Sequence, residues 1–353
     1  MIEETIDRIE PLDEKAMKFA KERQDFLTKP KDSLGILEKL SIQVTGITRN
    51  PMPKIRDKVI ITMAGDHGVV EEDVSAFPKE VTLQMVDNFI HGGAAINVLA
   101  RHIGARVIIV DIGVAIDIKP HKNVINKKVG YGTKNIARGA AMSYDEAIRS
   151  VEAGIEVLEE EIKKGVDIVG IGDMGIGNTT ASSAIVAAVT GERVERVTGR
   201  GTGINDAMYD NKIRVIKKAL EVNSPDGKDP LDVLAKVGGF EIGGLAGVVL
   251  GAAAHGIPVV MDGFVSAAGG LLATELAPLA KKYIIASHNS VEIGHNILLK
   301  RMGLRPLLDL NMRLGEGTGA ALGIGIVEAS VKILTEMATF EDAGVSKAIS
   351  DEV

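Results

Sequence analysis

Short apolar runs alternate along most of the chain with longer segments whose apolar residues recur at helical spacing. The strand-like runs are residues 58–63, 106–113, 166–170, 257–263 and 283–288. The helix-like segments between and after them are residues 80–102, 143–164, 180–190, 206–222, 241–255, 265–277 and 324–334. This alternation of buried strands with helices predicts an α/β fold, in which a mainly parallel sheet carries helices on both faces.

Three stretches depart from this alternation. Residues 13–27 and 33–47 form two amphipathic helical patterns, interrupted by Pro30 and Gly35. Residues 115–142 have little periodicity and predict irregular or edge structure. The run from Gly243 to Val260 carries no charge, but its glycines and Pro258 indicate a buried helix followed by a strand rather than a membrane span.

Composition excludes several classes of protein. The 353 residues suit two to three domains, or one large α/β unit with appendages. Only 3% of residues are aromatic, Trp is absent and the net charge is -7, which argues against a nucleic-acid partner. Without Cys there is no disulfide, thiolate nucleophile or Cys-ligated zinc. The acidic N-terminus lacks an apolar signal core, so we expect a cytoplasmic protein.

Polar residues follow each of the strand-like runs. These residues are Asp66 and His67, Asp111, Asp173, Asp262, and Ser287 with His288. Because ligands of parallel α/β sheets sit beyond the carboxyl ends of the strands, this edge is the expected active site. Asp66-His67 has no second His at ligand spacing, so no metal is expected, and Ser287-His288 lacks a nucleophile elbow.

Two glycine-rich loops are candidates for a phosphate site. Residues 170–175 match G-x-G-x-x-G, which alone would suggest a nicotinamide dinucleotide, but the motif continues into residues 177–180. A phosphate cradle is the better interpretation, and a simple tight turn is the alternative. Its residues would be Gly175, Gly177, Asn178, Thr179 and Thr180. The second loop contains Gly201 and Gly203, and Lys212 follows it, either as a phosphate ligand or as a solvated helix lysine.

A single carboxylate, Glu316, stands among Gly315, Gly317 and Gly319 directly ahead of the last apolar segment. The glycines let the backbone turn tightly and approach a ligand. Glu316 is therefore either a capping residue of the first helical turn or a functional group at a helix N-terminus.

From about residue 20 to 340 the chain closely resembles the nicotinate-nucleotide:dimethylbenzimidazole phosphoribosyltransferase family. The matching motifs are Lys29-Pro30-x-x-Ser33-Leu34-Gly35, Asp66-His67-Gly68-Val69, residues 92–97, Asp111-x-Gly113, Asn135-Ile136, residues 175–180, residues 236–240, Asp262-Gly263-Phe264, Ser287-His288 and residues 313–319. The resemblance implies a Rossmann-like large domain, residues 56–324, and a small helical domain from both chain ends, residues 1–55 with about 325–353. It also implies a homodimer without a cofactor.

The resemblance further implies the transfer of phosphoribosyl from nicotinate mononucleotide to 5,6-dimethylbenzimidazole. Glu316 would be the general base, with Asp173 as a second acidic residue, and Ser287 and Gly315 would join the two loops and Lys212 around the nucleotide. Phe77, Met85 and Leu314 would form the acceptor pocket. Asp173 replaces the family's usual Glu, and Asp32 replaces a Gly.

Three alternatives remain open from the sequence. The acceptor could be phenol or p-cresol, with a paralogue as partner in a heterodimer. The chain could instead be a silent subunit that supports a partner, or a nicotinamide-dependent dehydrogenase built on residues 170–175.

Overall fold

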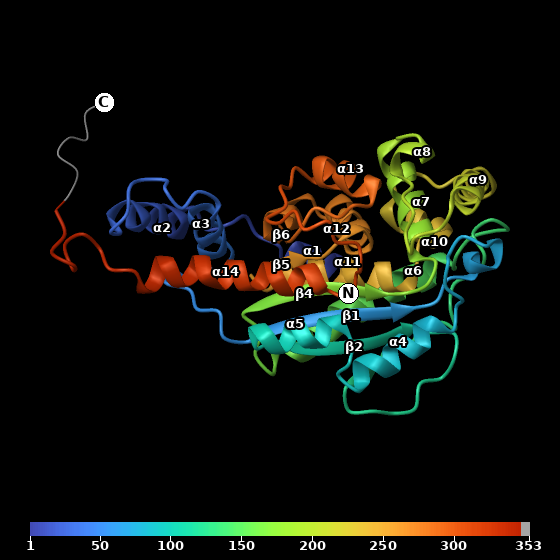
Figure 1. The fold of residues 1–353 in the computed structure, drawn as a ribbon, viewed down its shortest axis with the longest axis horizontal. Coiled ribbons are helices and arrows are strands. Elements are labelled where there is room, and N and C mark those ends of the chain that lie inside the picture. The colour runs from blue at the N-terminus through green and yellow to red at the C-terminus, as the bar shows by residue number, and fades with distance from the viewer. Residues whose placement is uncertain (347–353) are drawn as a thin grey trace. The chain divides into compact units, whose positions relative to one another are not determined.

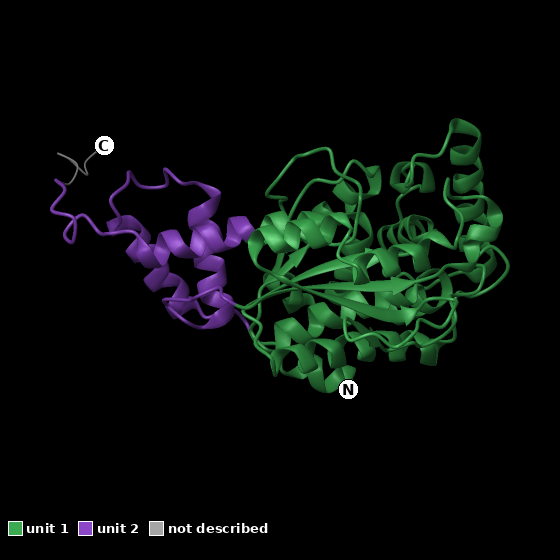
Figure 2. Cartoon of the chain, turned by 60° about the horizontal axis from the view of Figure 1, so that its bottom comes forward, with its two compact units in different colours: residues 1–10, 57–324 green, residues 11–56, 325–353 purple. Residues whose placement is uncertain are grey.

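The computed structural model describes residues 1–346 and divides into two compact units (Figure 2). The larger unit comprises Met1–Glu10 and Asp57–Ile324, and the smaller comprises Pro11–Arg56 and the chain from Gly325. The first ten residues thus lie in the larger unit and not in the helical domain, to which the resemblance assigns them. The reason is that α1 (Ile2–Asp7) buries Ile2 and Thr5 and contacts α6 and α11 of the larger unit.

The larger unit contains a six-stranded parallel sheet with the order β3-β2-β1-β4-β5-β6 (Figure 1). Its strands are β1 (Lys58–Gly65), β2 (Arg106–Gly113), β3 (Val124–Asn126), β4 (Ile168–Met174), β5 (Val259–Met261) and β6 (Ile284–Ala286). The predicted parallel α/β fold is confirmed. The strand order reverses between β1 and β4, and such a reversal opens a crevice at the carboxyl ends of the strands.

The helices of the larger unit surround this sheet. In chain order they are the 3₁₀ helix η1 (Gly68–Glu72), α4 (Val81–Ile90), α5 (Ala95–Ile103), α6 (Tyr144–Ile162), α7 (Asn178–Thr190), α8 (Val194–Val197), α9 (Asp206–Asn223), α10 (Pro230–Val237), α11 (Phe240–Ala254), α12 (Phe264–Leu276), η2 (Pro278–Tyr283), α13 (Ile293–Met302) and the start of α14 (Thr318–Glu336). The single helix predicted over 80–102 is wrong. It is two helices, because Gly92, at φ 76°, turns the chain between them.

The uncharged run from Gly243 to Val260 is α11 followed by β5, as predicted, and every residue of α11 except the last, Ala254, is buried. Glycines let α11 lie directly against α6. A Cβ on Gly247 would lie 1.9 Å from the Val151 carbonyl oxygen, and one on Gly154 would lie 2.0 Å from that of Gly244. By length and composition α14 could cross a membrane, but core helices share these properties, and 56% of its apolar window is buried.

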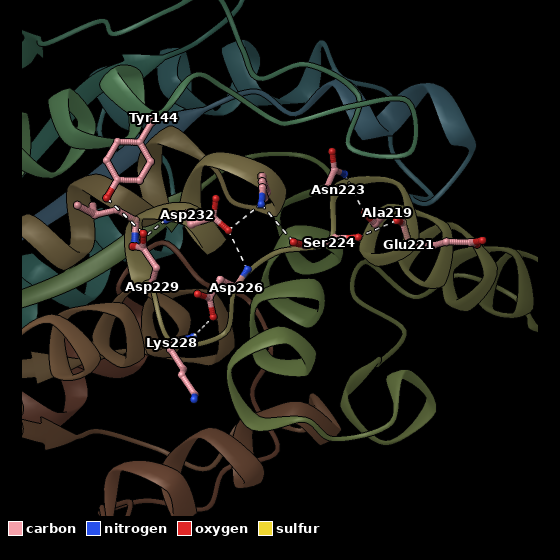
Figure 3. Close-up of polar contacts among 11 residues, drawn as sticks. Tyr144, Ala219, Glu221, Asn223, Ser224, Asp226, Lys228, Asp229 and Asp232 are labelled. Atoms are coloured by element: carbon pink, nitrogen blue, oxygen red, sulfur yellow. Dashed lines mark hydrogen bonds and ion pairs between the residues drawn. The ribbon is translucent and has the colours of Figure 1, made fainter.

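Helix α10 was not predicted, although Asp229-Pro230 carries its start signal. The Asp229 carboxylate accepts the backbone N–H groups of Leu231 and Asp232 at 3.0 and 3.1 Å (Figure 3). The carboxylate of Asp232 in turn accepts the N–H of Asp226 at 2.8 Å, which closes the connection from α9.

The smaller unit is helical. Helix α2 (Glu14–Phe26) packs on α3 (Ile36–Thr48), and the C-terminal part of α14 belongs to the same unit. Asp13 caps α2 by accepting the N–H groups of Lys15 and Ala16. A buried ion pair, Lys29 with Glu38 at 2.7 Å, holds the connection between the helices. Arg23 donates to the Leu334 carbonyl at 2.7 Å and ties α2 to the end of α14.

Candidate active site

A cavity of about 220 Å³ opens in the larger unit, where the loops after β4, β5 and β6 meet. Six segments of the larger unit form its wall, three that follow these strands and three from elsewhere in the chain. The strand-end segments are residues 173–179, 263–265 and 288–292, and the others are residues 74–77, 201–202 and 313–315. The position agrees with the prediction that polar groups at the strand ends surround a ligand site.

The turn between β4 and α7 forms one side of the cavity. A Cβ on Gly175 would lie 2.3 Å from the carbonyl oxygen of Gly65, so only glycine fits there. Gly177 has φ 93°, a conformation that glycine adopts without strain. Ile176 N–H donates to the Thr82 hydroxyl at 3.1 Å, which fixes the turn against α4. The start of α7 is thereby held at the cavity, where its amide dipoles favour an anion.

The same structure shows why residues 170–175 are no dinucleotide loop. Gly170 and Gly172 lie inside β4 rather than in the turn after it. A Cβ on Gly172 would lie 2.3 Å from Gly317 N, and one on Gly170 would lie 3.1 Å from the Ala320 Cβ. These two glycines make room for the start of α14 on the sheet.

The second glycine loop is held through both backbone polar groups of Gly201. The Glu292 carboxylate accepts the N–H of Gly201 at 2.8 Å, and Arg313 donates to the Gly201 carbonyl at 2.8 Å. Behind this loop Lys212 is only 1% exposed, and its ammonium group donates to the Thr179 hydroxyl at 2.8 Å. Burial lowers the pKa of Lys212 to about 8, although the charge of Glu292 opposes that shift. A cation thus lies directly behind both loops.

Asp173, at the end of β4, is the carboxyl group in the cavity wall nearest the first loop. It accepts hydrogen bonds from the Asn178 side chain at 2.9 Å and the Ser266 hydroxyl at 3.3 Å. Burial, together with the charges of Asp262 and Glu241, raises the pKa of Asp173 to about 8 despite these bonds. At neutral pH this carboxyl therefore holds a proton and can donate a hydrogen bond.

Glu316 lies beside the cavity but not in its wall, although its neighbours Gly315 and Asp173 line it. Its N–H donates to the Asp173 carbonyl at 3.1 Å, and its carboxylate accepts the N–H of Ile96, at the start of α5, at 3.1 Å. The side chain is 5% exposed, and burial raises its pKa. Its φ of 65° is unusual for a residue with a side chain and indicates a conformation that its surroundings enforce.

Asp262 holds the backbone on either side of Glu316. Its two carboxylate oxygens accept the N–H groups of Gly317 and Gly319 at 2.8 and 2.7 Å, and His288 lies 3.3 Å from one of them. A buried carboxylate therefore caps the start of α14 and fixes the direction in which Glu316 leaves the main chain.

Nine of the fifteen residues singled out from the sequence line the cavity. They are Phe77, Asp173, Gly175, Gly177, Asn178, Thr179, Gly201, Leu314 and Gly315. Outside the lining lie Met85, Thr180, Gly203, Lys212, Ser287 and Glu316. Thr180, Lys212 and Ser287 are buried behind it, and Met85 is half-buried on α4.

Sequence reasoning missed Glu292 and the role of Arg313 in this wall. Arg313 stood within the motif around Glu316, whereas Glu292 follows β6 by several residues and carries no local signal. Within residues 1–346 no three His, Cys, Asp or Glu side chains are grouped so that they could hold a metal ion.

The fold and the cavity together define a Rossmann-like α/β protein with a ligand site at the carboxyl ends of its strands. A family model described as "Phosphoribosyltransferase" matches residues 9–345. The chain belongs to this family, which confirms the resemblance seen in the sequence.

Its relatives share nearly the whole length. The chain is 58% identical over 351 residues, 99% of each chain, to a protein of Desulforudis audaxviator named nicotinate-nucleotide–dimethylbenzimidazole phosphoribosyltransferase. A protein of the same name from Roseiflexus is 57% identical, again over 99% of each chain. A crystal structure of the enzyme so named from Thermus thermophilus is 42% identical, with a TM-score of 0.90 over 96% of this chain and 100% of that one.

Proposed function

We propose that this protein transfers the phosphoribosyl group of nicotinate mononucleotide to 5,6-dimethylbenzimidazole, which yields α-ribazole 5'-phosphate and nicotinate. The relatives at 57 and 58% identity carry the name of this reaction. The observation on this chain that supports it best is the pair of glycine loops backed by buried Lys212, because this arrangement suits a phosphomonoester.

The reaction exchanges one bond at the ribose carbon for another. The bond from C1' to the nicotinate nitrogen breaks, and the electron pair leaves with nicotinate, which as a pyridinium needs no acid. A benzimidazole nitrogen forms the new bond on the opposite face, and the proton on the ring's other nitrogen must leave. The protein thus has to align two flat rings with one sugar and to accept one proton.

Glu316 is our candidate for the proton acceptor. Its raised pKa makes it a stronger base than an exposed glutamate. Its carboxylate now accepts the Ile96 N–H, so it would exchange this bond for one from the acceptor ring. Phe77 and Leu314, which are 51 and 59% exposed at the cavity, would cover the ring.

Asp173 is our candidate for a neutral hydrogen-bond donor to the nucleotide. With a pKa of about 8 it would present a proton rather than a charge to the substrate at neutral pH. A neutral group here would avoid repelling the phosphate that Lys212 attracts.

The test is an acceptor panel with nicotinate mononucleotide, in which nicotinate release is measured with 5,6-dimethylbenzimidazole, adenine, phenol and p-cresol. We expect the benzimidazole to be preferred by the protein purified without a partner. No turnover with any acceptor would refute the proposal. In the same assay Glu316→Gln should lose roughly 10²–10⁴-fold in kcat, and turnover near that of the wild type would remove its role as base.

The resemblance also underlies two further proposals, a homodimer and a cytoplasmic location. Light scattering of the purified chain would test the first and cell fractionation the second. The comparisons lend no support to a phenolic acceptor or a dehydrogenase.

A further inference from the structure

A buried pair of ionisable side chains, His67 and Glu241, lies next to the cavity but does not line it. His67 follows β1, Glu241 stands in the first turn of α11, and the His67 Nε2 lies 2.6 Å from a Glu241 carboxylate oxygen. Their side chains are 1 and 0% exposed. The chemistry proposed above uses neither residue.

The imidazole of His67 supports the first glycine turn from behind. A Cβ on Gly177 would lie 3.2 Å from the His67 Cβ, and one on Gly175 would lie 3.5 Å from its ring. On the opposite side the ring meets Gly239, where a Cβ would lie only 2.4 Å away. The ring therefore fills the space between the start of α11 and the turn that leads into α7.

The carboxylate of Glu241 places a charge near Asp173. Glu241 lies against the end of β1, because a Cβ on Gly65, the last residue of that strand, would lie 3.1 Å from the second Glu241 carboxylate oxygen. Strand β1 pairs with β4 up to the residue after Asp173, so Asp173 lies at the same end of the sheet. That second oxygen has no hydrogen-bond partner within residues 1–346. The charge of the Glu241 carboxylate is thus compensated by His67 and by the amide dipoles at the start of α11.

Other groups also face these side chains. Around the Asp173 carboxyl they are Asp262 after β5, Glu241 on α11, Asn178 on α7 and Ser266 on α12. Around His67 they are Glu241 and Asp66.

We propose that His67 and Glu241 act as a positioning pair, which holds the Gly175–Gly177 turn in place and sets the electrostatic environment of Asp173. The first part rests on the proposed function, because it takes that turn as the site of the nucleotide phosphate. The second part concerns the ligand-free protein alone.

The electrostatic part is tested by NMR titration of the Asp173 carboxyl carbon in ligand-free protein, assigned by its loss in Asp173→Asn. Glu241→Gln removes a negative charge, so the pKa of Asp173 should fall by about one unit or more. Glu161→Gln is the matched control, because Glu161 is also fully buried and paired, with Arg106 and Lys164, but is not among the groups whose charge raises the pKa of Asp173. An unchanged titration in Glu241→Gln, or an equal change in Glu161→Gln, would overturn this part.

The positioning part is tested by two replacements of His67. His67→Gln keeps an N–H donor near the position of Nε2, whereas His67→Leu keeps volume without any donor. His67→Leu should raise the KM for nicotinate mononucleotide by about tenfold or more, because displacement of the turn weakens binding, with a smaller change in kcat. His67→Gln should restore KM to within a few-fold of wild type. Equal KM values for all three proteins would refute the positioning role.

Two measurements keep the pair's failure separate from that of the proposed function. Calorimetric binding of nicotinate mononucleotide needs no acceptor, so the variants can be compared even if no transfer occurs. Circular dichroism shows whether each variant is folded. If His67→Leu does not fold, the comparison of Glu241→Gln with wild type decides whether the proposal stands.

Discussion

Replacing Asp173 by Asn should stabilise the protein while it damages the site. The carboxyl has a pKa of about 8 in the folded chain against 3.8 for the ordinary group. Between these values the unfolded chain has released a proton that the folded chain retains, so the free energy of unfolding falls as pH rises. Retaining this proton lowers the free energy of unfolding by about 1.4 kcal/mol for each pH unit above 3.8, which amounts to about 4 kcal/mol at pH 7.

Asparagine removes this cost because it does not titrate. Its carbonyl can accept the bond from Asn178, and its amide can donate to Ser266, whose hydroxyl can donate to the Ile171 carbonyl at 3.2 Å. The variant therefore keeps the local hydrogen bonds.

The assay is urea unfolding of both proteins, followed by far-UV circular dichroism at several pH values from 5 to 7.5. The stability of Asp173→Asn relative to wild type should grow by about 3 kcal/mol over this range, since the retained proton becomes more costly with each pH unit. For a slope near 3 kcal/mol per molar, this is a shift of about 1 M in the urea midpoint. A stability difference that is the same at every pH would show that Asp173 titrates normally and would refute the reasoning.

Three further predictions address the buried cation, the helix contact and the cap of α14. Nucleotide binding at pH 8.5 should be accompanied by proton uptake, because the pKa of about 8 at Lys212 should rise beside a phosphate. Calorimetry in buffers of different ionisation enthalpy should detect a smaller uptake in Lys212→Met, where Asp173, with its pKa of about 8, can still gain a proton, and an equal uptake in both proteins would contradict the role of Lys212. Gly247→Ala should lower the free energy of unfolding in urea by about 1–3 kcal/mol or more, because its Cβ would lie 1.9 Å from the Val151 carbonyl oxygen. Gly139→Ala is the control and should change this free energy little, because a Cβ there would meet nothing within 4 Å. Equal effects of the two replacements would contradict the packing argument. Asp262→Asn leaves one of the Gly317 and Gly319 N–H groups without its carboxylate acceptor. It should therefore lower the free energy of unfolding by about 1–3 kcal/mol in the same urea assay and slow nicotinate release. An unchanged rate of release would show that this cap does not hold Glu316.

The sequence by itself determined the fold class and the family. Short apolar runs and helical patterns are local properties, so the strand predicted over 166–170, which spans Ile168–Met174 in the structure, and the buried α11 could be predicted from their own residues. The rule for parallel sheets then placed Asp173 and Asp262 at the edge that carries the cavity. The start signal of α10 at Asp229-Pro230 is local as well.

The tertiary structure alone decided which distant residues meet. The strand order β3-β2-β1-β4-β5-β6, the clamp of Gly201 by Glu292 and Arg313, and the pair of His67 with Glu241 all join residues far apart in the chain. It also decided that Lys212 is buried and that the Glu316 carboxylate faces α5 rather than the cavity. No local pattern encodes such contacts, because they depend on how complete helices and strands pack together, and burial in that packing is what shifts the pKa values of the site.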